Sequence, residues 1–243
     1  MPPAPLDERI AELRADPGRT WGVPDALLAL LAVPLSLTVV GLLLVSGLDL
    51  PPAVATAIAA AVLAGLAVLA GRRAARQSGG WERALGLDLP EWSDTWRILG
   101  WSLLLLLVQG GVTALLQQLV EPLEGAVADN ASFLREEPLW ALLVFAVAAV
   151  AVAPVLEELL FRGLVLRGLM MRTGFWPAAV LSSVLFGLFH AQGTDASSAL
   201  VVVATAVFGL GLCVLARRTG RLGPGIGVHA LRNAVAVFAV TQL

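Results

Sequence analysis

Long apolar runs, separated by short polar or proline-rich stretches, fill most of this chain. A helix needs about 20 apolar residues to cross the roughly 30 Å hydrocarbon layer of a membrane. By this criterion the pattern predicts seven spans, at 26–46, 53–71, 98–119, 139–166, 176–191, 197–216 and 224–241. Because Pro154 lacks a backbone donor, the fourth span can divide into two helical pieces. We expect an all-α, polytopic transmembrane helical bundle of seven to eight helices.

The composition narrows the class of protein further. Of the 243 residues, 58% are hydrophobic and only 14% are charged, which excludes an ordinary water-soluble domain. A net charge of −2 offers no basic face to nucleic acid. The only cysteine, Cys213, lies in an apolar run, so a disulfide framework or a cysteine-based zinc site is not expected. The partner expected first is the lipid bilayer.

The arginines predict how the chain sits in the membrane. The chain has no lysine, and 13 of its 16 arginines fall in the N-terminal segment or in loops after the second, fourth and sixth spans. Positively charged loops stay in the cytoplasm, so the N-terminus is expected there. The Ala/Arg/Gly-rich composition suggests a prokaryotic inner membrane. In the N-terminal segment, Leu6, Ile10 and Leu13 share one helical face, typical of a helix lying on the inner membrane surface.

Three segments are expected along the chain. Residues 1–24 form a cytoplasmic N-terminal segment, 25–138 carry the first transmembrane helices and loops, and 139–243 form a catalytic helical core. This last segment holds all the ionisable residues that fall inside predicted spans, namely Glu157, Glu158, Arg162, His190, His229 and Arg232. Each charge at the centre of a bilayer costs about 2.5–3.5 kcal/mol, so the set indicates a hydrated site lined by protein. Interhelical pairs that only hold the bundle together are the alternative.

The spacing of these residues assigns them candidate roles. Glu158 and Arg162 stand four positions apart, with the acid first, which favours an ion pair and leaves Glu157 free to face another group. Glu157 and His190 both lie about 25 Å along their helices from the turn near Gly174, so they are expected to meet. There they can hold and deprotonate a water molecule.

The third group of the candidate site lies on the last span. His229 and Asn233, four positions apart, share a helix face, and both can donate hydrogen bonds to a tetrahedral oxyanion. For Asn233, an interhelical hydrogen bond is an equally good interpretation. Glu157, His190 and His229 are also the candidate ligands if a metal is present. The cofactor is therefore either none or a single divalent metal such as zinc.

Three short motifs combine these residues. Glu157-Glu158 with Arg162 resembles EExxxR, Phe186 with His190 resembles FxxxH, and His229 with Asn233 resembles HxxxN. In this order, on successive membrane helices, they resemble the CPBP family of intramembrane proteases, which includes the CAAX prenyl proteases and bacteriocin-processing and immunity proteins.

The resemblance implies an intramembrane endopeptidase that hydrolyses a peptide bond of a membrane-associated peptide or protein. It implies that Glu157 and His190 activate water, that His229 and Asn233 stabilise the oxyanion, and that Glu158 and Arg162 position the substrate. The family is described both as glutamate-dependent and as metal-dependent, so the metal stays open. A non-enzymatic scaffold or immunity protein of the same fold and, less favoured, an ion or proton transporter are the alternatives.

Overall fold

The computed structural model describes residues 5–16, 18–19, 21–31, 39, 42–43, 50–120, 134, 137–191 and 194–241. Within these residues every regular element is a helix, which confirms the all-α bundle. The elements are α1 (Leu6–Ala15), α2 (Val23–Leu30), α4 (Pro52–Gln77), α5 (Trp81–Leu85), η1 (Trp92–Asp94), α6 (Thr95–Leu119), α7 (Leu139–Val147), η4 (Ala148–Val152), α8 (Ala153–Glu158), η5 (Leu159–Leu166), α9 (Arg167–Met170), α10 (Phe175–Phe189), α11 (Ala196–Thr219) and α12 (Gly223–Thr241).

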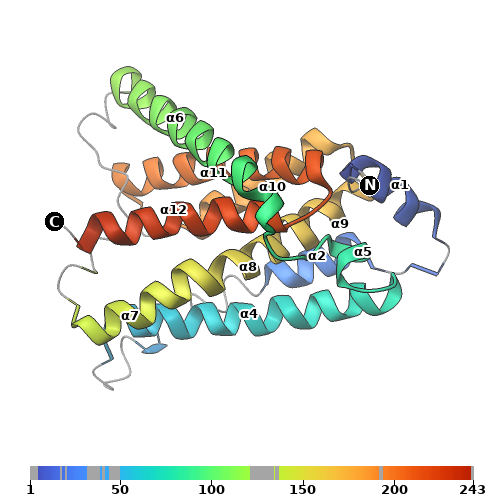
Figure 1. The fold of residues 1–243 in the computed structure, drawn as a ribbon, viewed down its shortest axis with the longest axis horizontal. Coiled ribbons are helices and arrows are strands. Elements are labelled where there is room, and N and C mark those ends of the chain that lie inside the picture. The colour runs from blue at the N-terminus through green and yellow to red at the C-terminus, as the bar shows by residue number, and fades with distance from the viewer. Residues whose placement is uncertain are drawn as a thin grey trace.

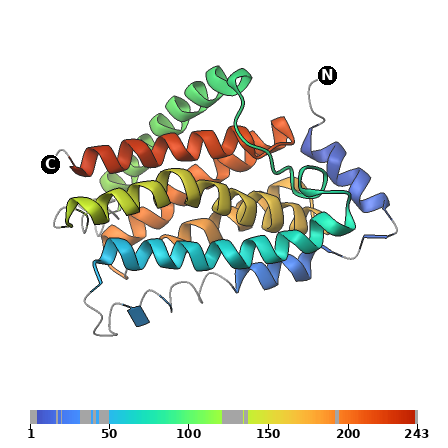
Figure 2. The same cartoon turned by 60° about the horizontal axis from the view of Figure 1, so that its bottom comes forward.

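A continuous helical run over 139–170 forms the middle of the bundle. It consists of α7, α8 and α9 joined by two π-helical segments, η4 and η5. It contacts α2, α4, α10, α11 and α12, and α4 lies along it in both views (Figures 1 and 2). All eight residues of η5 are buried, so this segment is packed against protein on every side.

Four helical runs among the described residues are long and apolar enough to cross a membrane: 52–77, 92–119, 139–170 and 196–219. They match the second, third, fourth and sixth predicted spans. The fourth does not divide at Pro154, because a π-helical segment directly before the proline keeps the helix continuous. The first predicted span lies largely outside the described residues, as does most of the loop containing Arg135.

The fifth and seventh predicted spans correspond to the shorter helices α10 and α12. α10 has only 15 residues, about 22 Å of helix, which is less than a full crossing of the hydrocarbon layer. α12 has 19 residues and carries His229 and Asn233. These two helices, together with the middle run, bring the polar residues together.

The amphipathic helix expected near the N-terminus is present as α1, but its apolar face covers protein rather than membrane. Leu6, Ile10 and Leu13 are almost fully buried in the main hydrophobic core. Asp7 pairs with Arg217 of α11 at 2.8 Å. α1 therefore closes the end of the bundle where α4, α5 and α11 also meet (Figure 1).

The start of α12 is fixed by a charged cluster outside the spans. Asp88 accepts a hydrogen bond from the Gly223 backbone N–H at 2.7 Å and pairs with Arg221, which also meets Glu91 at 2.9 Å. Burial lowers the pKa of Arg221, but the hydrogen bond and charge of Asp88, with the charges of Asp94 and Glu91, outweigh it and raise the pKa overall. The cluster sets where α12 begins and so where its polar residues stand.

α10 and α11 approach each other at a glycine. A Cβ atom on Gly187 would overlap the backbone carbonyl oxygen of Val202 and stand 3.0 Å from the Cβ of Ala206. A backbone atom in a packed helix cannot move aside as the end of a flexible side chain can.

We expect Gly187→Ala to destabilise the protein in detergent, by about 1–3 kcal/mol, because of this overpacking. Gly100→Ala on α6 is the matched control, since a Cβ there meets nothing within 4 Å. It should be neutral or slightly stabilising, because alanine favours helix more than glycine does. Thermal unfolding followed by circular dichroism compares the two, and equal melting temperatures would contradict the close packing.

Candidate active site

The ion pair expected between Glu158 and Arg162 is present and buried. Arg162 Nη1 lies 2.9 Å from Glu158 Oε1, and the two side chains are 0% and 1% exposed. Breaking a buried pair by removing one partner typically costs about 3–5 kcal/mol, because the remaining charge has no compensation. This pair is therefore a fixed part of the core.

Arg162 is held on its other sides by α10 and α11. Its Nη2 donates to the Gly209 carbonyl at 3.0 Å, and its guanidinium lies 4.3 Å from the centre of the Phe186 ring. A Cβ on Gly209 would stand 3.0 Å from that Nη2, so a larger residue there would crowd the guanidinium. Arg162 thus ties the middle run to both neighbouring helices.

Glu157 meets both histidines. Its Oε2 lies 3.8 Å from His190 Nε2 and 3.6 Å from His229 Nε2. The expected approach of Glu157 and His190 is therefore found. Glu157 Oε2 is buried and has no hydrogen-bond partner among the described residues. Both distances exceed a direct hydrogen bond and fit a water-mediated one.

His190 follows directly after the last residue of α10, and its tautomer follows from its partner. The ring Nδ1 lies 2.8 Å from the Phe186 carbonyl oxygen. A carbonyl can only accept, so Nδ1 carries the proton, and in the neutral ring Nε2 presents a lone pair. A carboxylate oxygen and a nitrogen lone pair cannot bond each other, but a water between them can donate to both.

His229 is 1% exposed, and both its nitrogens face carboxylates. Nδ1 lies 3.3 Å from Glu158 Oε1, while Nε2 faces Glu157. The rings of Phe186 and Phe208 make edge contacts with it at 5.7 and 5.5 Å. Glu158, itself fixed by Arg162, therefore sets the orientation of this imidazole.

Asn233 lies one turn beyond His229 on α12, but its amide bonds the middle run. Nδ2 donates to the Ala149 carbonyl at 2.8 Å. In the π-helical η4 the Ala153 N–H bonds Ala148 O, five residues back, so the carbonyl of Ala149 would be paired with the N–H of residue 154. That residue is proline and has no N–H. Asn233 supplies the missing donor.

Several residues around the site were not found from the sequence. Phe208 and Gly209 lie in an apolar span whose pattern does not separate them from ordinary core residues. Ser182, which donates to the Phe161 carbonyl at 2.9 Å and so satisfies an acceptor of η5, is equally inconspicuous. Phe186, the first residue of the FxxxH motif, packs against His190, with the ring centroids 4.7 Å apart.

The three candidate metal ligands do not form a coordination set. Among the residues that the structure describes, no group of three or more His, Cys, Asp or Glu side chains is arranged to hold a metal ion. The Nε2 atoms of His190 and His229 lie 3.8 and 3.6 Å from Glu157 Oε2. A carboxylate beside two imidazoles can hold and polarise a water molecule.

The middle run, α10, α11 and most of α12 match a known family. Residues 138–235 match the family model of the Rce1-like type II CAAX prenyl endopeptidases. The match confirms the resemblance expected from the three motifs, all of which lie within it. Together with the long apolar helices, it supports an integral membrane protein and an intramembrane endopeptidase of the CAAX type. Comparison with curated proteins and with solved structures gives no significant match.

We expect Asn233→Ala to destabilise the protein by about 0.5–1.5 kcal/mol, because the partly buried Ala149 carbonyl loses its donor. Pro154→Ala restores an N–H at the position where η4 lacks one. The double variant Pro154→Ala/Asn233→Ala should therefore recover part of the loss, measured by thermal unfolding in detergent. Strictly additive effects of the two substitutions would contradict the proposed replacement of one donor by the other.

Proposed function

We propose that the protein is an intramembrane endopeptidase that hydrolyses a membrane-associated peptide or protein with water activated by Glu157 and His190. The observation that carries this function is that a buried carboxylate oxygen, without a hydrogen-bond partner in the described part of the chain, lies 3.8 and 3.6 Å from two imidazole nitrogens. A water that donates one hydrogen to Glu157 Oε2 and the other to His190 Nε2 is held in place and polarised for attack.

The reaction then follows from these groups. The water oxygen attacks the carbonyl carbon of the scissile peptide bond as Glu157 takes its proton, and the carbonyl π electrons move to oxygen. When the tetrahedral intermediate collapses, the C–N bond breaks, and the proton passes from Glu157 to the leaving nitrogen. The products are a carboxylic acid and an amine, and water is the only co-reactant.

His229 and Asn233 are proposed to stabilise the oxyanion. In support, His229 lies between two carboxylates, with Nδ1 3.3 Å from Glu158 Oε1 and Nε2 3.6 Å from Glu157 Oε2, and a proton carried on Nε2 can be donated to the substrate carbonyl oxygen. Asn233 can turn one of its two N–H groups toward the substrate while the other keeps Ala149. Glu158 and Arg162 act by positioning these donors and the bound substrate.

The proposal also covers the membrane in which the protein resides and the substrate that it cleaves. The Ala/Arg/Gly-rich, lysine-free composition supports a prokaryotic inner membrane, and the arginine distribution supports a cytoplasmic N-terminus. Residues 139–243 would form the catalytic core, behind a cytoplasmic segment 1–24 and the helices of 25–138. Because the matching family is described as acting on CAAX prenyl proteins, a prenylated C-terminal peptide is the first substrate to test.

We expect Glu157→Gln to lower hydrolysis by at least about 100-fold, because general base catalysis contributes roughly 10²–10⁴. The assay uses purified protein in proteoliposomes with a prenylated reporter peptide, and compares peptide termini in cells carrying either form. Cys213→Ala is the control, since this buried cysteine lies outside the proposed chemistry. Equal processing by wild type and Glu157→Gln would favour the non-enzymatic scaffold.

Metal removal gives a second, independent measurement. Because the donor atoms do not form a coordination set, we expect prolonged dialysis against a strong chelator to leave the rate of hydrolysis within about twofold. Loss of activity that returns on adding one equivalent of zinc would contradict the water held by Glu157 and His190 alone.

A further inference from the structure

A cluster of arginines marks the point where α4 leaves its apolar stretch. The helix is apolar until Gly71, and Arg72, Arg73 and Arg76 follow within its last turns. Charges that begin where apolar residues end lie at the level of the lipid headgroups. This end of α4 lies beside α5 (Figure 1).

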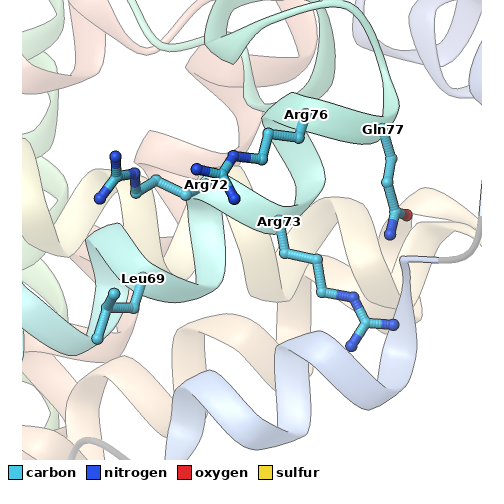
Figure 3. Close-up of a pocket in the computed structure, with 5 residues that line it drawn as sticks. All are labelled: Leu69, Arg72, Arg73, Arg76 and Gln77. Carbon is cyan, nitrogen blue, oxygen red and sulfur yellow. The ribbon is translucent and has the colours of Figure 1, made fainter.

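The arginines line a cavity of about 280 Å³ together with Leu69 and Gln77 (Figure 3). Figure 3 shows Arg72 and Arg76 extending along the same side of α4, while Arg73 points to the other side. Leu69 is 62% exposed and stands three positions before Arg72. Two cationic groups and an apolar side chain therefore lie next to one another at the membrane surface.

The arginines differ in their partners. Arg73 pairs with the buried Asp25 of α2 at 3.2 Å, so it links two helices. Arg72 and Arg76 are exposed, and neither makes an ion pair within the part of the chain that the structure describes. Like charges four positions apart on a helix repel each other. An anion bound between them removes this repulsion.

We propose that Arg72 and Arg76 form a binding site for the headgroup of an anionic phospholipid. Two guanidinium groups match the geometry of phosphate oxygens, which arginine binds through paired N–H donors. Leu69, toward the hydrocarbon side, contacts the first carbons of the acyl chains. Basic pockets beside membrane helices recognise anionic headgroups in this way.

The test uses the intact protein in detergent, titrated with short-chain phosphatidylglycerol and followed by native mass spectrometry. Arg72→Gln and Arg76→Gln should each weaken binding about fivefold. Arg172→Gln is the matched control, because it removes the same charge from an exposed arginine outside the cavity, and binding should stay within about twofold. Phosphatidylcholine, whose phosphate is neutralised by choline, should bind all forms more weakly than phosphatidylglycerol binds the wild type.

Three results would overturn the site: equal binding of the two lipids, equal loss in Arg76→Gln and Arg172→Gln, or competition by inorganic phosphate as strong as that by lipid. The last would assign a free phosphate site instead. Because Arg72→Lys/Arg76→Lys keeps both charges but loses the paired donors, intermediate binding by this variant supports headgroup recognition. The measurement needs no peptide hydrolysis, so it is independent of the proposed protease activity.

Discussion

The buried pair of Glu158 and Arg162 is the interaction on which the site depends. Both side chains are buried, Glu158 at the end of α8 and Arg162 in η5, and the pair reaches α10 through Phe186 and α11 through the Gly209 carbonyl. Glu158 also faces His229 of α12. One ion pair therefore orients an imidazole on another helix and, through it, the surroundings of Glu157. Burying two charges costs free energy, and contacts from four helices offset that cost here.

The π-helical segments lie where the middle run accepts hydrogen bonds from neighbouring helices. Turns of π-helix often occur at functional sites. Within η4 and η5, Asn233 donates to the carbonyl of Ala149, which Pro154 leaves without a backbone donor, and Ser182 donates to the carbonyl of Phe161. Both donors come from neighbouring helices. The backbone of the middle run therefore accepts side-chain hydrogen bonds that join it to α12 and α10.

Much of this arrangement follows from the sequence, because charges in apolar spans are few and their spacing is regular. The equal distances of Glu157 and His190 from the turn near Gly174 predicted that the two meet, and they lie 3.8 Å apart. What was missed depends on backbone geometry. The carbonyl of Gly209 and the need of η4 for the donor of Asn233 carry no residue-type signal, since any residue offers a carbonyl. The covering of α1 by protein was missed because an amphipathic helix looks the same against lipid or core.

The short α10 places a demand on its surroundings. Its 15 residues follow the turn that carries Arg172 and end just before His190. Lipid hydrocarbon cannot satisfy the backbone groups at a helix end, so these groups need protein or solvent beside them. Solvent that reaches this helix end stands next to one of the two side chains proposed to hold the attacking molecule, which gives hydrolysis a supply route inside an oily phase.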